Sequence, residues 1–250
     1  MNLVNLSPLH LHVRREARRR FNANPSKAYQ RYIREVYFEY RERPAASLAD
    51  AHVVPITNQR AAEIILKHEH LGTMAAGTIA CYGLRYENQL IGVVCFAKGG
   101  SSQALKTIHP DPSKVVLLAR GTCAPHAPHN SASFLIRRAC KQASKDYGWT
   151  HFIGYSDEQA GERGQIYKAC NWKCLGKSKQ GIKTAFISPT GQRMSSYSFN
   201  RKSDKKFYAL GWDGEEGKYA FLRRLGWTEH TEEIKTRWLW IEPKTLTATA

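Results

Sequence analysis

Residues 155–172 read YSDEQAGERGQIYKACNW, and the fold can be worked out from this stretch. It follows a short apolar segment, His151–Tyr155, that is predicted to be a strand, and it ends in a short helix. Asp157 therefore comes at the carboxyl end of an interior strand, where open α/β sheets bind their ligands. Gly161 and Gly164 let the backbone approach a ligand closely, and the following helix offers free N–H groups to an anion. The stretch predicts a ligand site.

Patterns on both sides of this stretch predict a layered α+β domain. The predicted elements are a strand at His52–Thr57, a helix at Gln59–His70 with Asn58 as N-cap, strands at Ile79–Arg85 and Gln89–Ala97, a buried strand at Lys114–Ala119, a helix at Ser131–Tyr147, a helix at Gly164–Asn171, and strands near Thr184–Ile187 and Thr236–Ile241. Strands and helices alternate around one antiparallel pair, which predicts a central mixed β-sheet flanked by helices.

The N-terminal part is predicted to be a basic helical extension. Residues 11–43 read as one long helix, in which Pro25 is the residue able to break it. The predicted organisation is this extension over residues 1–50, the sheet domain over residues 51–190, and a β-rich and helical extension over residues 191–250 that packs on the same domain.

The charge of the chain points to a polyanionic partner. It has 38 Lys and Arg against 21 Asp and Glu, a net charge of +17, and most of the excess lies in His10–Arg43 and Tyr167–Lys206. Aromatic residues are interleaved with the basic ones: Tyr29, Tyr32, Tyr37, Tyr40, Tyr197, Phe199 and Phe207. Because cations neutralise phosphates and aromatic faces stack on bases, we predict nucleic acid as the partner. The alternative is a solvated helix face followed by a basic loop.

Composition excludes several classes of protein. A hydrophobic share of 42% excludes a disordered chain. No apolar run approaches the roughly 18–20 residues that span a bilayer, and the N-terminus does not read as a secretory signal. We therefore expect a cytoplasmic protein with no membrane partner, whose cysteines are free thiols in a reducing compartment. These are Cys81, Cys95, Cys123, Cys140, Cys170 and Cys174.

The stretch 155–172 resembles the hallmark segment of phage Mom-type proteins, which modify adenine in DNA and form a divergent branch of the acetyltransferase-like (GNAT) fold. That segment has Asp, a short gap, Gly, two residues, Gly, two residues, then Tyr-Gln-Ala and an aromatic residue; here Lys168 stands where Gln is usual. Two other stretches carry the resemblance, LARG at 118–121 before a helix opened by NSAS at 130–133, and HEHLGT at 68–73. It covers roughly residues 52–180.

The resemblance implies a GNAT-like fold for the sheet domain and a function for the chain. The implied function is an acyltransferase-like enzyme that adds a small acyl-derived group, carbamoylmethyl-like, to the exocyclic amine of adenine in DNA. This modification would protect phage DNA from restriction in the host cytoplasm. DNA and an acyl-donor small molecule are then the partners, and the base must be single-stranded or flipped out of the duplex.

Two residues of the stretch are candidates for proton transfer. Burial can raise the pKa of Asp157 so that its carboxylate accepts a proton from an amine. Tyr167, one helical turn after Gly164, can direct its hydroxyl into the same cleft, and the resemblance implies that it protonates a leaving thiolate. Glu69 and His70 are predicted to line the acceptor side of the cleft or to cap the helix that they end. The structural alternatives are that Asp157 caps the short helix and that Tyr167 packs in the core.

Arg120 and Ser133, with Gly161 and Gly164, are predicted to bind the donor. Arg120 ends an apolar strand, where a permanent charge needs an anion or a carboxylate. It could bind a phosphate, hold Asp157 ionised, or form a structural ion pair. Ser133 matches a serine at the start of the family's helix and either donates to a ligand or serves the helix N-terminus.

The loop at residues 120–130, RGTCAPHAPHN, departs from the acetyltransferase pattern. Ordinary acetyltransferases hold the coenzyme pyrophosphate on a glycine-rich loop, whereas this loop has two prolines, which lack N–H donors. Acetyl-CoA and a different acyl donor both remain open. Cys123, His126 and His129 have a spacing that suits iron or zinc and are weak metal candidates, to which His68 and His70 could add ligands.

Three functions fit the sequence. The first is the DNA-modifying transferase. The second is a GNAT-type N-acetyltransferase that acts on a small amine or a protein, with basic residues serving the coenzyme phosphates. The third is a non-catalytic nucleic-acid-binding module, which would retain its full biological effect in the variants Asp157→Asn and Tyr167→Phe.

Overall fold

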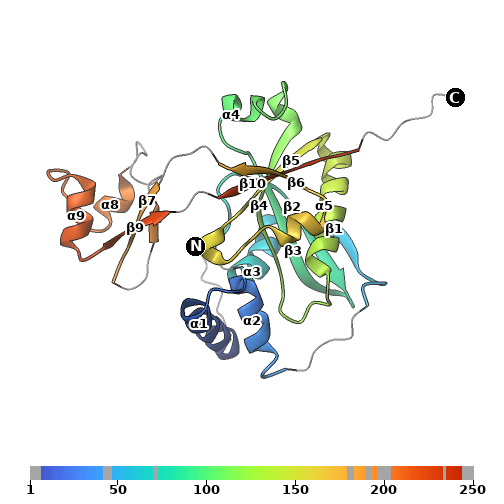
Figure 1. The fold of residues 1–250 in the computed structure, drawn as a ribbon, viewed down its shortest axis with the longest axis horizontal. Helices are drawn as coiled ribbons and strands as arrows, with labels where there is room; N and C mark the ends of the chain where they lie inside the picture. Colours follow the sequence, from blue (N-terminus) through green and yellow to red (C-terminus); the bar gives the residue numbers. More distant parts are fainter. Residues whose placement is uncertain are drawn as a thin grey trace. The chain divides into compact units, whose positions relative to one another are not determined.

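A seven-stranded mixed sheet organises the larger of two units in the computed structural model (Figure 1). One unit comprises residues 1–176 and 236–250, and the other comprises residues 177–235. The structure describes residues 7–41, 47–69, 73–178, 183–189, 193–195, 204–232 and 235–243.

The strands of the large sheet follow one another in space in an order that differs from the order in the chain. This order is β1 (His52–Ile56), β2 (Thr78–Tyr86), β3 (Gln89–Ala97), β4 (Val115–Cys123), β5 (His151–Ser156), β10 (Thr236–Ile241) and β6 (Lys173–Lys177). The first four strands pair antiparallel, β5 runs parallel to β4, and β10 pairs antiparallel with β5. The predicted α+β class, with a central mixed sheet flanked by helices, is confirmed.

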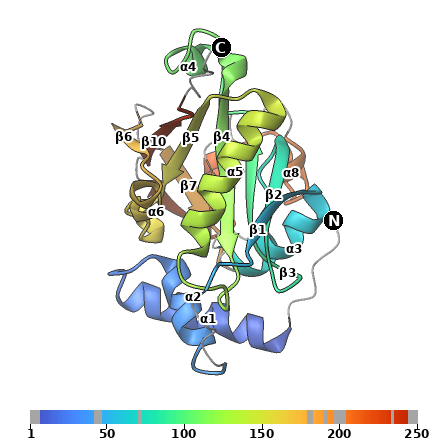
Figure 2. The ribbon, with the colours of Figure 1, turned by 90° about the vertical axis from the view of Figure 1, so that its right-hand side faces the viewer.

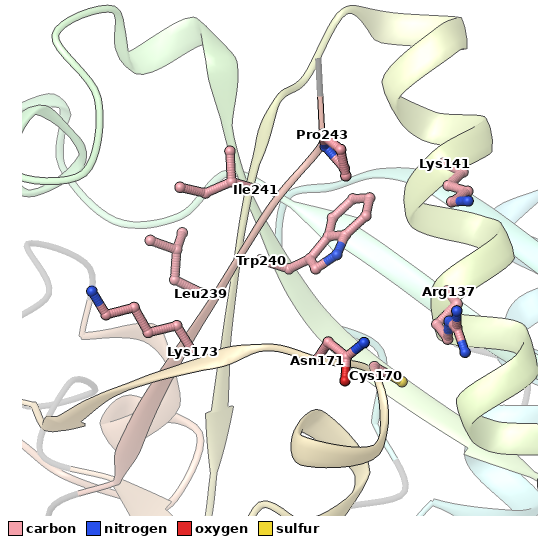
Figure 3. A pocket seen from close by; sticks show the side chains of 9 residues that line it. All are labelled: Arg137, Lys141, Cys170, Asn171, Lys173, Leu239, Trp240, Ile241 and Pro243. Carbon is pink, nitrogen blue, oxygen red and sulfur yellow. The ribbon is translucent and has the colours of Figure 1, made fainter. Parts of the chain in front are cut away.

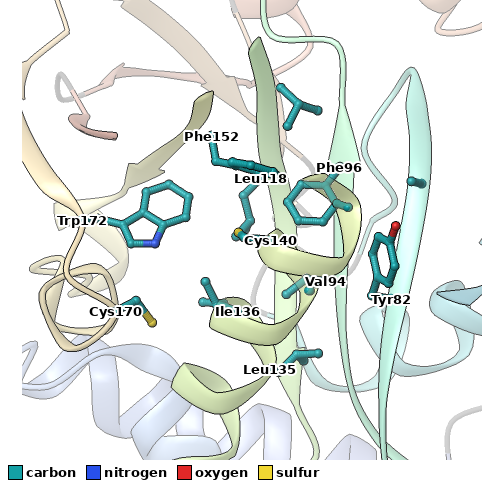
Figure 4. Close-up of a cluster of buried hydrophobic side chains, with 14 of the residues drawn as sticks. Tyr82, Val94, Phe96, Leu118, Leu135, Ile136, Cys140, Phe152, Cys170 and Trp172 are labelled. Carbon is teal, nitrogen blue, oxygen red and sulfur yellow. The ribbon is translucent and has the colours of Figure 1, made fainter. Parts of the chain in front are cut away.

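One face of the sheet is covered by α5 (Ser131–Tyr147), which has the bounds predicted from the sequence. Leu135 and Cys140 of this helix are buried against Val94 and Phe96 of β3 and Phe152 of β5, as Figure 4 shows. The alternation of the strands places every second side chain on this face. This cluster is the main core of the large unit.

The opposite face is covered by α3 (Asn58–His68) and the short helix α4 (Ser102–Lys106). Val93 and Cys95, which alternate with the core residues of β3, are buried here with Ile65 of α3. The sulfur atoms of Cys81 and Cys95 lie 3.3 Å apart across β2 and β3. All six cysteines of the chain are free thiols.

The cap of α3 differs from the prediction. The hydroxyl of Thr57 accepts the backbone N–H of Arg60, so Thr57 is the N-cap and the prediction of Asn58 was wrong by one residue. The Asn58 side chain accepts the thiol of Cys81 instead. Since Thr and Asn both cap helices well, the residue types alone did not separate the two positions.

The basic extension forms two helices, α1 (Pro8–Ala23) and α2 (Tyr29–Tyr37), so the prediction of one long helix was wrong. Pro25 stands between them, where its missing N–H and its ring prevent the helix from continuing. Each helix has an apolar stripe, and the two stripes bury each other. We call this pair the α1–α2 hairpin.

The smaller unit has a sheet and a core of its own. Its sheet has the order β8 (Arg193–Ser195), β7 (Lys183–Ile187) and β9 (Thr228–Glu232), with the helices α8 (Lys205–Tyr208) and α9 (Lys218–Arg224). Phe207 and Trp227 are buried in its core, while the predicted stacking residues Tyr197 and Phe199 lie outside the described residues. The chain leaves the large unit after β6 and returns in β10, and these strands are neighbours in the large sheet.

The predicted division into residues 1–50, 51–190 and 191–250 stays a prediction. Within the described ranges, no helix has both the length and the apolar character that crossing a bilayer requires.

Candidate active site

The parallel strands β4 and β5 diverge after three residue pairs. The pairing runs from Val115 with His151 to Leu117 with Ile153. In the described part of the chain no pair follows, although β4 continues to Cys123. The register of β4 against β3 also shifts at this point, between its pairs with Phe96 and Cys95. The facing backbone groups at the carboxyl ends of β4 and β5 therefore do not bond to each other. The carboxyl ends of strands are the place where open sheets bind ligands.

Tyr167 of α6 (Gln165–Ala169) lies over β5 beside this divergence, on the α5 face. Its hydroxyl donates to the carbonyl oxygen of Tyr155 at 3.4 Å, and its ring stacks on that of Trp238 with centroids 5.6 Å apart. A Cβ at Gly154 would lie 2.7 Å from the hydroxyl oxygen, so only glycine fits beneath it. The side chain is buried, with 7% of its surface exposed. The ring of Tyr167 is thus a core residue whose hydroxyl reaches the edge of β5.

The Tyr167 phenol is held in its protonated form. Burial raises the pKa of its hydroxyl far above the ordinary value, and the charge of Glu162 raises this pKa further. The group can donate a proton at neutral pH but does not carry a charge there. The negative charge of Glu162 acts on this hydroxyl. Glu162 was not among the residues predicted for the site.

Asp157 directly follows β5, as predicted, and opens a tight turn. Its carbonyl oxygen accepts the N–H groups of Ala160 and Glu162 at 3.0 and 2.9 Å. Its own N–H donates to the Glu162 carboxylate at 3.1 Å. The N-cap of α6 is Gly164, so Asp157 does not cap that helix. The turn therefore brings two carboxylates, Asp157 and Glu162, to the end of β5.

The two glycines predicted to approach a ligand both approach atoms of this chain. A Cβ at Gly161 would lie 2.5 Å from the carbonyl oxygen of Lys27, in the loop between α1 and α2, and a Cβ at Gly164 would lie against the ring of Trp238. Both glycines have φ of +71°, which also favours glycine. Internal packing accounts for them, and their role in binding a donor stays a prediction.

Arg120 and Glu69 lie on the other face of the sheet, with α3. The Arg120 guanidinium donates to the carbonyl oxygens of Thr73 and Ala119 at 2.8 and 2.7 Å. Glu69, the C-cap residue of α3, is 4% exposed. The charges of Arg120 and Glu69 both act on the thiol of Cys95, which places them around the same buried sulfur. His70, the remaining predicted catalytic residue, lies outside the described residues.

The N-terminus of α5 lies after the loop that follows β4. Its N-cap Asn130 has φ of 64° and makes no side-chain capping bond. The hydroxyl of Ser133 donates backwards to the Asn130 carbonyl oxygen at 3.0 Å, so it serves the helix start. First-turn N–H groups that no cap side chain accepts are a suitable place for an anion, since α5 is a long helix.

Cys123, His126 and His129, the weak metal candidates of this loop, lie in different surroundings. Cys123 packs toward Gly92, and burial raises the pKa of its thiol to about 12. His126 faces Tyr37 of α2 with ring centroids 6.1 Å apart, and His129 is exposed. Among the residues that the structure describes, no three His, Cys, Asp or Glu side chains are grouped so that they could hold a metal ion. The described residues do not fit an iron or zinc site.

The α1–α2 hairpin packs at this same end of the sheet, as Figure 2 shows. Arg14 of α1 donates to the carbonyl oxygens of Leu66 and Lys67 in the last turn of α3, at 3.0 Å each. The rings of His10 in α1 and His68 in α3 have centroids 5.3 Å apart. The basic extension therefore lies beside the candidate site.

Arg15 and Arg31 of the hairpin, and Arg41 shortly after α2, are exposed and have no partner among the described residues. Arg15, Arg31 and Arg41 make no hydrogen bond or ion pair with any residue in the described ranges. Other cations of the hairpin are engaged: Arg20, for example, binds both Glu16 and Glu39. The unpaired arginines are available to an external anion.

The tyrosines of the hairpin do not form the stacking surface that the sequence predicted. Tyr29 and Tyr32 are only 2% and 7% exposed, because two short helices need large apolar side chains to bury each other. Tyr37 is half-buried against His126, and Tyr40 alone among these four is largely exposed. The prediction was wrong for the two buried rings.

The fold and the site define an α+β protein with a mixed sheet, whose parallel strands diverge beside a protonated phenol and an acidic turn. The chain belongs to the Mom protein family, whose model matches residues 50–223. The resemblance found in the sequence is confirmed. No curated protein matches the chain.

The chain is also similar to solved structures of acetyltransferases. One is Arabidopsis thaliana NAA60 in complex with acetyl-CoA, 13% identical, with 77% of this chain and 98% of that chain covered and a TM-score of 0.43. Another is the IAA acetyltransferase from Bacillus cereus, 12% identical, with 76% of this chain and 99% of that chain covered and a TM-score of 0.40. A GNAT family acetyltransferase from Elizabethkingia anophelis with acetyl-CoA bound is 8% identical, with 77% of this chain and 99% of that chain covered and a TM-score of 0.41.

Proposed function

We propose that this protein transfers a small acyl-derived group, carbamoylmethyl-like, to the exocyclic amine of adenine in DNA, and so protects phage DNA from restriction. Membership of the Mom family supports the class of reaction. The observation that carries the proposal is the protonated Tyr167 hydroxyl at the end of β5, beside the turn that holds Asp157 and Glu162. An acid and a base are then available on one strand end.

The transfer step needs two proton movements. The amine nitrogen attacks the carbonyl carbon of a thioester donor, a C–N bond forms and the C–S bond breaks, so the first product is an N-acyl adenine. If the acyl group is aminoacetyl, this product is an isomer of carbamoylmethyl-adenine. It becomes carbamoylmethyl-adenine when the adenine nitrogen moves from the carbonyl carbon to the methylene carbon and the amino nitrogen takes its place on the carbonyl carbon. The carboxylate of Asp157 takes the proton that the amine loses, and the Tyr167 hydroxyl gives its proton to the departing thiolate. Its raised pKa keeps the phenol protonated until the thiolate forms. Both groups then return to their starting states by exchange with solvent.

The donor is proposed to enter at the divergence of β4 and β5. There, backbone groups of the two strands are not paired with each other, so they could bind the donor's amide groups. Phosphates of a donor of the coenzyme A type would meet the N-terminus of α5, which has no side-chain cap. Pro125 and Pro128 contribute no N–H groups, so the helix start and not the loop would bind them.

DNA is proposed to bind across the α1–α2 hairpin. Arg15, Arg31 and Arg41 are exposed, unpaired in the described part of the chain and close in sequence to the contacts that fix the hairpin beside the site. Each neutralised phosphate releases counterions, so binding should weaken steeply as salt rises. The target base would leave the duplex to reach the strand end.

Mass spectrometry of nucleosides tests the proposal. DNA from cells that express the wild-type protein should contain a new adenosine-derived mass, and DNA from cells with Asp157→Asn or Tyr167→Phe should contain far less of it. Unmodified DNA in the presence of folded wild-type protein, or turnover of a small amine in place of DNA, would overturn the assignment. Full biological effect in both variants would leave only a binding module.

The salt dependence of DNA binding tests the role of the hairpin. We expect the double variant Arg15→Gln/Arg31→Gln to lower the slope of log K against log salt by about two units, because two phosphate contacts are lost. The control Arg85→Gln/Lys106→Gln removes the same charge from β2 and α4, and it should leave the slope unchanged. Equal slopes for both double variants would place the DNA elsewhere.

A further inference from the structure

A cavity of about 440 Å³ lies beside the first half of β5, and its wall includes Cys170, the C-cap residue of α6. Its wall includes Trp240 and Ile241 of β10, which pair with Phe152 and His151 at the start of β5. The candidate site is at Tyr155 and beyond, at the end of the same strand. The volume lies within the roughly 300–1,000 Å³ of small-molecule sites. Neither the transfer chemistry nor the hairpin uses this cavity.

The cavity is lined by three cations and no acid. Arg137 and Lys141 come from α5, and Lys173 comes from β6. None of the three makes an ion pair or a side-chain hydrogen bond with a described residue. Glu242 stands next to the lining residues Ile241 and Pro243 in the chain; burial raises the pKa of its carboxyl, while the charges of Lys141 and Lys145 lower it. With Lys141 offset in this way, Arg137 and Lys173 still leave the cavity cationic.

A flat aromatic surface completes the cavity. Figure 3 shows the indole of Trp240 directed from β10 toward α5, where Arg137 and Lys141 stand. Its inner side packs on Phe152 with centroids 5.3 Å apart, and the residue is half-buried. The indole N–H has no hydrogen-bond partner in the described part of the chain. The side chain of Asn171 adds a carboxamide at the rim.

We propose that this cavity binds a nucleoside phosphate, with the phosphate on Arg137 and Lys173 and the base on the Trp240 indole. Guanidinium and ammonium groups neutralise phosphates, and base–indole stacking adds an attraction that does not depend on the base. The choice of a nucleotide among anions that carry a flat ring rests on the proposed function. The nucleotide can be free, or it can belong to a single strand of the DNA substrate.

The indole N–H resonance of Trp240 gives a local measure of binding to the full-length protein. Titration with dAMP should shift this resonance in a saturable way, and inorganic phosphate or deoxyadenosine alone should bind at least tenfold more weakly. Trp240→Phe identifies the resonance. A shift with a short single strand that lacks terminal phosphates identifies DNA as the source, and a shift with dAMP alone identifies a free nucleotide.

Matched double variants decide whether the cations bind the ligand. Arg137→Gln/Lys173→Gln should weaken dAMP binding at least tenfold, whereas Arg138→Gln/Lys168→Gln, which removes the same charge outside the cavity, should change it less than twofold. Equal binding by both double variants, no saturable shift, or phosphate binding as tightly as dAMP would overturn the proposal. The last result would mean a simple anion site.

The two proposals fail separately. Tyr167→Phe should bind dAMP at this cavity as the wild type does, because Tyr167 does not line the cavity and its hydroxyl bonds to Tyr155 near the carboxyl end of β5. If the protein does not modify adenine but still shows the Trp240 shift, the nucleotide site stands without the proposed reaction. If the protein modifies adenine but dAMP does not shift the Trp240 resonance, the proposed reaction is supported and the nucleotide site is wrong.

Discussion

At the scale of single residues, Tyr167 packs in the core, and the proposed function also gives its hydroxyl a chemical role. Replacing it by Phe keeps the ring on Trp238 and removes only the hydroxyl, whose bond to Tyr155 is long at 3.4 Å. We expect the rate of DNA modification to fall by roughly 10²–10⁴, the usual contribution of a general acid. The free energy of unfolding should change by less than about 1 kcal/mol, because little hydrogen-bond energy is lost.

Tyr82 provides the opposite control. Its hydroxyl donates to the Asp146 carboxylate at 2.6 Å, far from the divergence of β4 and β5. Tyr82→Phe should lower the free energy of unfolding by about 1–3 kcal/mol and leave the modification rate unchanged. Urea unfolding and nucleoside mass spectrometry on both variants check the pair. An unchanged modification rate in Tyr167→Phe would remove this tyrosine from the chemistry.

Gly161 links the acidic turn to the hairpin. We expect Gly161→Ala to destabilise the protein by roughly 2–4 kcal/mol, because the new Cβ meets the backbone of Lys27 and because alanine is strained at φ of +71°. Gly176→Ala has nearly the same φ, +78°, but meets nothing within 4 Å, so it should cost only about 1–2 kcal/mol.

Urea unfolding of these two glycine variants isolates the contact between the turn and the hairpin. Hydrogen exchange in α1 and α2 should rise in Gly161→Ala and stay unchanged in Gly176→Ala. Equal losses of stability in the two variants would mean that the hairpin moves away from the turn without cost.

At the scale of elements, the sequence predicted those strands and helices that local pattern specifies. The strong apolar runs predicted β2, β3 and β5 to within one or two residues, and the helical spacing predicted both ends of α5. Pro25 marks the break between α1 and α2, but the hairpin was missed because the return of α2 along α1 depends on whether the apolar stripes of the two helices meet. That is a tertiary contact, which no local pattern records.

The contact between α1 and α3 should make the protein sensitive to acid. Burial, and the nearby charges of His10, His126, Lys67 and Arg14, lower the pKa of His68 to about 3. In the unfolded chain this pKa returns to about 6.5. Below that pH the unfolded chain takes up a proton that the folded chain does not, so stability falls as the pH decreases from 6.5 toward 3.

The size of this effect can be measured by urea unfolding between pH 7.5 and pH 4.5. We expect His68 to account for a loss of up to about 1.4 kcal/mol for each pH unit below 6. His68→Asn should flatten the dependence, whatever its effect at neutral pH, whereas His129→Asn, at an exposed position, should leave the slope as it is. An unchanged slope in His68→Asn would assign the acid sensitivity to other groups.

At the scale of the whole molecule, the candidate site was predictable in part. Asp157 was found because it follows a recognisable strand, and Tyr167 because of the motif around it. The involvement of Glu162 depends on how the turn closes, and the internal use of Gly161 and Gly164 depends on where Lys27 and Trp238 lie. Contacts between residues more than 70 positions apart in sequence cannot be read from spacing.

The two units should separate cleanly in a designed variant. Because β6 and β10 are neighbours in the sheet, replacing residues 178–235 by a short Asn-Gly turn should leave the larger unit folded. Each unit has a hydrophobic core of its own. We therefore expect the shortened protein to unfold in a single cooperative thermal transition, with a near-ultraviolet circular dichroism spectrum that still shows packed aromatic side chains. Loss of that transition would show that the smaller unit is needed to fold the sheet.

The insertion between β6 and β10 also has a consequence for the history of the gene. Recombination at this one junction can lengthen, shorten or exchange the segment without shifting the register of any other strand. Homologous genes should therefore differ most in length between the codons of these two strands. Separate lineages of the gene would have here a place to vary, while the sheet encoded on either side stays the same.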